Sequence, residues 1–88
     1  MRVIAIESIK NGVCRSYGEG EYIGHREPNG GWMKDLGIKN PCIKLDSGKY
    51  IWGYQCWWGE IEKFNNKYKE LIKEIIIVDV DENIEPKP

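Results

Sequence analysis

The segment CIKLDSGKYIW, residues 42–52, constrains the fold most. Apolar and polar residues alternate on both sides of its SG pair, which predicts two antiparallel strands joined by a two-residue turn. In that register Leu45 pairs with Tyr50 and Ile43 pairs with Trp52, so these four side chains share one face. Trp52 is then expected in the core, because a buried tryptophan is an effective way to fill a small core.

Two further strands are predicted before this hairpin. Residues 2–9, RVIAIESI, are rich in β-branched residues, and the NG that follows shortly after suits a tight turn. Residues 13–25, VCRSYGEGEYIGH, resume as a strand whose internal glycines indicate a strong bend or a close approach of another backbone. Residues 26–41 then form a long connection, a feature typical of functional or mobile loops.

A helix and a last strand are predicted after the hairpin. A single apolar stripe at spacings of three and four indicates an amphipathic helix over about residues 60–74. Its members are Ile61, Phe64, Tyr68, Leu71 and Ile75. IIIVDV, residues 75–80, predicts a final strand. The globular domain is expected to span residues 1–81, and residues 82–88 to form a flexible tail, with docking of Ile84 as the alternative.

Length and charge narrow the class of protein. Eighty-eight residues fill a single core. The formal net charge of −1 argues against a sequence-independent duplex binder, which needs a surplus of lysine and arginine. The longest apolar run is too short to span a bilayer, and the N-terminal residues lack the apolar segment of a signal peptide. The expectation is a cytoplasmic protein that has no membrane partner.

Metal binding and catalysis find little support in the sequence. Cys14, Cys42 and Cys56 are odd in number and widely spaced, which indicates reduced thiols. With His25 they offer four zinc ligands, but the chain lacks the close Cys-x2–4-Cys pair of structural zinc sites. No phosphate loop, HExxH motif or identifiable Ser/His/Asp set is present. We therefore expect no metal, no cofactor and no enzymatic activity.

The glycine-marked strands also carry a family resemblance. GEGEYIG, followed by NPCIKLDSGKYIWGYQC, resembles small SH3-like barrels of the Tudor and KOW type over roughly residues 3–58. The resemblance implies a mainly β (α+β) fold, a small and strongly bent SH3-like barrel with one appended amphipathic helix and a C-terminal strand. The segment LDSGKYIWGYQCWWG is also similar to small proteins encoded by bacteriophages.

The tryptophan pair raises a question that the sequence leaves open. If the strand runs on regularly from Trp52, then Tyr54 and Trp58 lie on its face, and Gln55 and Trp57 lie on the other. One arrangement buries both Trp57 and Trp58, one in the core and one under the helix. The other leaves one of the two, with Tyr54 and Gln55, in an exposed pocket or interface, where tryptophan is enriched.

The long connection supplies a second group of candidates around its NGG. Tyr22 and His25 precede it, Arg26 is suited to holding a phosphate, and Trp32 is suited to stacking on a base. Glycine amides in NGG are available to an anion. These residue types together indicate recognition of a nucleotide.

We therefore expect a small non-enzymatic, phage-encoded protein of anti-defence type, which binds or sequesters a nucleotide-like small molecule in the host cytoplasm. The candidate ligand-binding residues are Tyr22, His25, Arg26, Trp32, Tyr54, Gln55, Trp57 and Trp58. A homo-oligomer is expected, because a pocket in so short a chain is readily shared between subunits. Two alternatives stay open: a protein–protein inhibitor of a host factor, and a Tudor- or KOW-like nucleic-acid-binding module.

Overall fold

One long, bent strand organises the computed structural model, which describes residues 1–88. The elements are β1 (Arg2–Lys10), β2 (Val13–Arg26), β3 (Asn40–Leu45), β4 (Tyr50–Trp52), β5 (Trp57–Glu60), α1 (Ile61–Tyr68) and β6 (Glu74–Ile77). The strands form one sheet in the order β4-β3-β2-β1-β5, and β6 pairs with β2. The fold is mainly β with one helix, as predicted, but the sheet is open and does not close into the predicted barrel.

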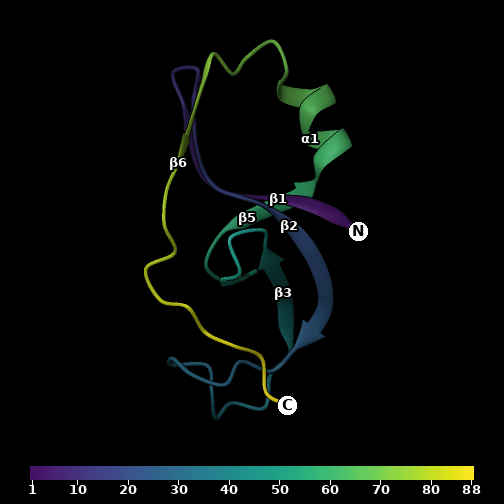
Figure 1. The fold of residues 1–88 in the computed structure, drawn as a ribbon, viewed down its shortest axis with the longest axis vertical. Coiled ribbons are helices and arrows are strands. Elements are labelled where there is room, and N and C mark those ends of the chain that lie inside the picture. Colours follow the sequence, from purple (N-terminus) through teal and green to yellow (C-terminus); the bar gives the residue numbers. More distant parts are fainter.

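β2 has neighbours on both sides. β1 pairs with it antiparallel along one side, through the two-residue turn Asn11-Gly12. On the other side its first residues, Val13–Ser16, pair parallel with β6, and its later part pairs antiparallel with β3 from Gly20 onwards. β6 and β3 therefore follow one another along the same side of β2, and Figure 1 shows the chain curving between these two regions.

Glycines allow this curvature, as the sequence predicts. The pairing of β1 with β2 shifts register next to Gly18, whose φ is +104°. At Gly20 a Cβ atom would lie 2.4 Å from the carbonyl oxygen of Lys44 and 2.8 Å from the Cα of Leu45. Only glycine permits β2 and β3 to approach this closely.

The predicted register of the central hairpin is wrong by one residue. The amide of Leu45 donates to the carbonyl oxygen of Lys49 at 2.8 Å, so Leu45 pairs with Lys49 and not with Tyr50. The loop therefore contains three residues, 46–48, and ends at Gly48 with φ +95°. A three-residue loop of this kind places a residue with positive φ last, and Gly48 meets that requirement without strain.

The shift by one residue changes which side chains share a face. Ile43 pairs with Ile51, and Cys42 pairs with Trp52. Trp52 is fully buried, as predicted, but it faces away from Ile43 and needs a different cover.

Three small apolar clusters replace a single core. The first lies on one face of the sheet and contains Val3, Ala5, Ile43, Leu45, Ile51 and Val80. The second lies between the opposite face and α1 and contains Ile4, Ile6, Cys14 and Phe64. The third contains Cys42, Trp52 and Ile84.

The helix is shorter than predicted. α1 ends at Tyr68, so Leu71 and Ile75 do not continue its apolar stripe, and both are exposed. The amides of Lys73 and Glu74 instead donate to the carbonyl oxygen of Gly12, which brings the chain beside β2. The run of isoleucines favours a strand, and β6 confirms that a final strand exists, but it spans Glu74–Ile77 and not the predicted residues 75–80.

Residues 82–88 return along the end of the sheet to the long connection (Figure 1). Ile84 is buried, and the indole Nε1 of Trp52 donates to its carbonyl oxygen at 2.8 Å. The side-chain oxygen of Asn83 accepts from the amide of Tyr50 at 2.8 Å. Docking of Ile84, the alternative in the sequence analysis, is the arrangement in the structure.

Replacement of Ile84 by alanine tests whether this docking completes the third cluster. Ile84→Ala is expected to lower the free energy of unfolding by about 2–5 kcal/mol, because it leaves a cavity beside Trp52. Leu36→Ala, at an exposed position in the long connection, is the control and is expected to change it by less than about 0.5 kcal/mol. Urea denaturation measures both, and equal effects of the two variants would contradict the docking.

Candidate functional site

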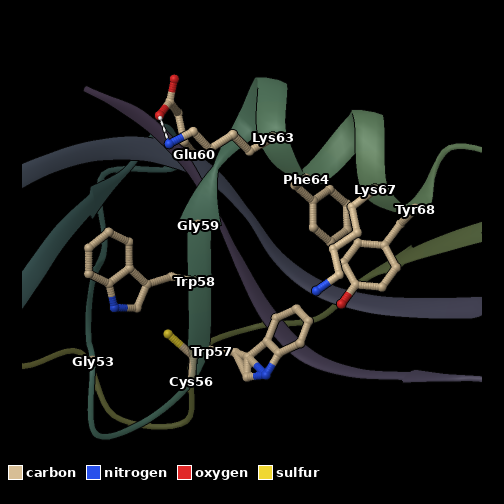
Figure 2. Close-up of a pocket in the computed structure, with 10 residues that line it drawn as sticks. All are labelled: Gly53, Cys56, Trp57, Trp58, Gly59, Glu60, Lys63, Phe64, Lys67 and Tyr68. Carbon is tan, nitrogen blue, oxygen red and sulfur yellow. Dashed lines mark ion pairs between the residues drawn. The ribbon is translucent and has the colours of Figure 1, made fainter.

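An open groove of about 480 Å³ lies between β5 and α1. Figure 2 shows Trp57, Lys67 and Tyr68 on one side of β5 and Trp58 on its other side. The volume lies within the range of roughly 300–1,000 Å³ that is typical of small-molecule sites. Five of its ten lining residues are hydrophobic, and two are lysines.

β5 directs its two tryptophans to opposite sides, as predicted. Trp58 packs against the first apolar cluster and stacks on Tyr22, with ring centroids 5.1 Å apart and an interplanar angle of 12°. Trp57 faces α1, 5.9 Å from the ring of Tyr68, and keeps 49% of its surface exposed. Trp57 is therefore the member of the pair that leaves an aromatic face exposed in the groove.

α1 supplies the opposite wall through two pairs of residues at a spacing of four. Phe64 is buried, and its ring lies 5.0 Å from that of Tyr68. The ammonium group of Lys67 lies 5.3 Å from the centre of the Tyr68 ring, within cation–π range. Lys63 is exposed, and its ammonium group lies 3.7 Å from a carboxylate oxygen of Glu60, an ion pair that contributes little to stability.

The backbone of β5 adds polar groups to the groove. β5 pairs only with β1 and forms one edge of the sheet. Alternate residues of an edge strand direct their N–H and C=O groups away from the sheet, where no strand satisfies them. Gly59 has no atom within 4 Å of the place where a Cβ would stand, so a ligand can approach the backbone there.

The predicted residues of the long connection form a separate group. The ring of Trp32, which is 75% exposed, lies edge-on to Tyr54 with a centroid distance of 5.8 Å. Tyr54 also packs on the third apolar cluster beside Trp52. The connection lies at the opposite end of the molecule from α1 (Figure 1), so Trp32 and Tyr54 do not join the groove.

The other predicted residues have different surroundings. The hydroxyl of Tyr22 lies 2.5 Å from Nδ1 of His25. Arg26 ends β2 and is exposed, with no ion pair or side-chain hydrogen bond. The side-chain oxygen of Gln55 accepts the amide of Trp52 at 3.0 Å, so Gln55 supports a turn.

The turn from Trp52 to Gln55 contradicts the prediction that Tyr54 and Trp58 share a face of one strand. The strand does not run on regularly from Trp52, because β4 ends there and the amide of Gln55 donates to the carbonyl oxygen of Trp52 at 2.8 Å. Trp58 and Tyr54 therefore belong to different apolar clusters. The turn carries the chain from one edge of the sheet to the other.

Eight of the ten lining residues were absent from the predicted site, and four of these eight belong to α1: Lys63, Phe64, Lys67 and Tyr68. Phe64 and Tyr68 were interpreted only as part of an apolar helical stripe. Lys63 and Lys67 are four residues apart, as Phe64 and Tyr68 are, so on a helix the two lysines lie next to the apolar stripe. This spacing was the sequence signal that could have identified them.

All three thiols are poorly suited to thiolate chemistry. Burial raises the pKa of Cys56 to about 12. Burial also raises the pKa of Cys42 to about 11, although the charge of Arg26 opposes this shift. The pKa of Cys14 rises for the same reason. The thiols are therefore protonated near neutral pH, whereas the thiolate is the form that attacks or binds metal. No group of three or more His, Cys, Asp or Glu residues is arranged to hold a metal ion.

Comparison with known proteins gives no match to a family model, a curated protein or a solved structure. α1 has neither the length nor the apolar composition needed to cross a membrane.

The hydroxyl oxygen of Tyr54, whose ring lies beside Trp32 and Trp52, is buried without a hydrogen-bond partner. Removal of this hydroxyl tests whether it is unsatisfied in the folded protein. Tyr54→Phe is expected to raise the free energy of unfolding by about 1 kcal/mol, since it removes an unsatisfied polar group. Tyr22→Phe, which loses the contact with His25, is the matched control and is expected to lower it by about 0.5–1.5 kcal/mol. Chemical denaturation measures the free energy of unfolding of both variants. An equal decrease in the two variants would contradict the conclusion that the hydroxyl of Tyr54 is buried without a partner.

Proposed function

We propose that this protein is a non-enzymatic binding protein that holds a nucleotide-like small molecule in the groove between β5 and α1. The observation that carries the proposal is the half-exposed ring of Trp57 in a groove that Lys63 and Lys67 also line, with the ammonium group of Lys63 turned towards Glu60 (Figure 2). An aromatic face and cations in one groove match the base and the phosphate of a nucleotide.

Each part of such a ligand has a complementary group. A base stacks on the exposed face of Trp57, and base stacking on an aromatic side chain is worth about 1–3 kcal/mol. The unpaired backbone groups along the edge of β5 are available to the polar edge of the base. Lys67 and Lys63 attract the phosphate, and Lys63 is available because its pairing with Glu60 is exposed and weak.

Charge favours a small anion over a long polyanion. Of the lining residues, two lysines and one glutamate give the groove a local charge of +1, whereas the whole chain carries −1. A nucleic-acid-binding surface would instead need an extended set of cations along a polymer backbone. The groove therefore supports the small-molecule proposal better than the nucleic-acid alternative.

The proposal also includes the two resemblances noted in the sequence, to SH3-like barrels and to small bacteriophage proteins. The four strands β1-β2-β3-β4 follow one another as neighbours, and their bends at Gly18 and Gly20 support the SH3-like resemblance. The similarity to bacteriophage proteins suggests sequestration of a nucleotide signal in a host cell as the biological role. Sequestration requires binding alone and so fits a groove without a catalytic group.

Titration with nucleotides tests the proposal. Tryptophan fluorescence and the thermal midpoint are followed together against mono-, di- and cyclic nucleotides and short oligonucleotides. We expect quenching and a higher midpoint with a small nucleotide, because a ligand that binds only the folded state stabilises it. Trp57→Ala is expected to weaken that binding about 10-fold or more through lost stacking. Trp32→Ala, at an exposed tryptophan outside the groove, is the matched control and should bind as the wild type does.

The same experiment separates the alternatives. A flat response across the whole panel would exclude the nucleotide and favour the protein–protein inhibitor. Preference for oligonucleotides, with affinity that falls steeply as salt rises, would favour the nucleic-acid-binding module. Loss of binding in Trp32→Ala but not in Trp57→Ala would assign the ligand to the long connection.

A further inference from the structure

The register of β1 determines which backbone groups of β5 face outwards. The amide of Tyr22 donates to the carbonyl oxygen of Met1 at 3.0 Å, so Met1 directs its backbone groups towards β2. Because this direction alternates along a strand, Val3 also bonds to β2, and Ile4 bonds to the strand on the other side, β5. Ile4 lies opposite Gly59, so these two residues exchange the hydrogen bonds between β1 and β5.

The two neighbours of Gly59 in β5 consequently point away from β1. The amide and the carbonyl oxygen of Trp58 and the amide of Glu60 lie on the free edge of the sheet. No strand or turn of the chain pairs with these three groups. The edge therefore offers a carbonyl acceptor and, two residues further along, an amide donor.

The groove beside α1 extends over this free edge. Figure 2 shows Trp57 and Tyr68 on one side of β5 and Trp58 and Gly53 on its other side, and all four residues line the same groove. Gly59 has no side chain, and no atom lies within 4 Å of the place where its Cβ would stand. The groove is therefore open between the ring of Trp57 and the free edge.

We propose that the free edge of β5 recognises the base of the nucleotide, with the carbonyl oxygen of Trp58 as acceptor and the amide of Glu60 as donor. The inference rests on the proposed nucleotide site and adds which part of the ligand faces β5. Each nucleobase has donors and acceptors side by side on the edge that pairs in a duplex. Proteins that hold an unpaired base bind this edge and stack on its ring. Trp57 supplies the stacking face, and the open space at Gly59 admits the base.

The cations of the groove agree with this orientation. Lys63 and Lys67 both belong to α1, on the opposite wall of the groove from β5. A base whose pairing edge is turned to β5 directs its ribose and phosphate away from that strand and towards the lysines. The recognised class is therefore a nucleotide with an unblocked pairing edge, and a sugar phosphate or an inorganic phosphate lacks the group that β5 binds.

Nucleotides with a blocked edge test the inference, with binding followed by tryptophan fluorescence. The four ribonucleoside monophosphates are each compared with an analogue methylated on the pairing edge: twice on the amino nitrogen of adenine or cytosine, once on the ring N–H of guanine or uracil. The analogue of each nucleotide that binds is expected to bind about 10-fold more weakly or worse, because a site that hydrogen-bonds a group rejects ligands without it. Equal binding of parent and analogue would overturn the inference and leave the proposed function standing.

Two substitutions at position 60 separate the backbone amide from the side chain. Glu60→Pro removes the N–H, and the φ of Glu60, −62°, already suits proline. Glu60→Ala removes the carboxylate but keeps the N–H, so it is the matched control. Glu60→Pro is expected to bind the nucleotide about 2–10-fold more weakly than Glu60→Ala, the effect of one hydrogen bond. Equal binding by the two variants would overturn the assigned role of this amide.

A third variant fills the space beside Trp57. Gly59→Ala adds a methyl group where no atom lies within 4 Å, and the φ of Gly59 is not positive, so the thermal midpoint of the free protein should not fall. The methyl group takes the place of the base, and binding is expected to weaken about 10-fold or more. Unchanged binding would overturn this placement of the base. A wild-type protein that responds to none of the nucleotides would instead overturn the proposed function, and this inference with it.

Discussion

β2 bends where Gly20 brings its backbone against β3, and this bend determines where the other elements can lie. The first residues of β2 pair with β6, and the later residues pair with β3, on the same side of the strand. A straight strand of this length would give a flat sheet with one continuous apolar face. The bent strand instead divides the buried residues among three clusters, each of them small. A chain of this size has little surface to bury, so each cluster depends on a cover from elsewhere in the sequence.

Those covers come from segments far away in the chain. Phe64 of α1 covers Ile4 and Ile6, and Ile84 covers Trp52. The indole of Trp52 also donates to the carbonyl oxygen of Ile84, which satisfies a polar group that burial would otherwise leave without a partner. The C-terminal residues are thus part of the fold for the same reason as the helix: each shields one face of a sheet that cannot shield itself.

Local patterns in the sequence predict the local structure well. The β-branched run of β1, the NG turn, the glycines of β2 and the opposite directions of Trp57 and Trp58 all follow from alternation and φ preferences. The predicted register of the hairpin was wrong because SG can end either a two-residue or a three-residue loop. The alternation of apolar and polar residues in the flanking strands is compatible with both loop lengths. Only the hydrogen bond from Leu45 to Lys49 distinguishes them.

Contacts between distant segments could not be predicted in this way. The pairing of β6 with β2 truncates the helical stripe at Tyr68, and no signal within residues 60–74 reports that pairing. The groove was found only in part for a similar reason. Trp57 and Trp58 were prominent in the sequence, whereas Lys63 and Lys67 gain meaning only when α1 packs beside β5. A site at the junction of two elements becomes visible once their relative position is known.

The position of α1 determines two grooves on the surface of the fold. Phe64 and Tyr68 line both the groove beside β5 and the groove beside Ile75 of β6. The helix is short, and no side chain caps its first turn, so packing of Phe64 and its neighbours is its main support. A nucleotide in the groove beside β5 would therefore contact the same two rings that line the groove beside Ile75, and its binding would depend on the packing that holds α1 in place.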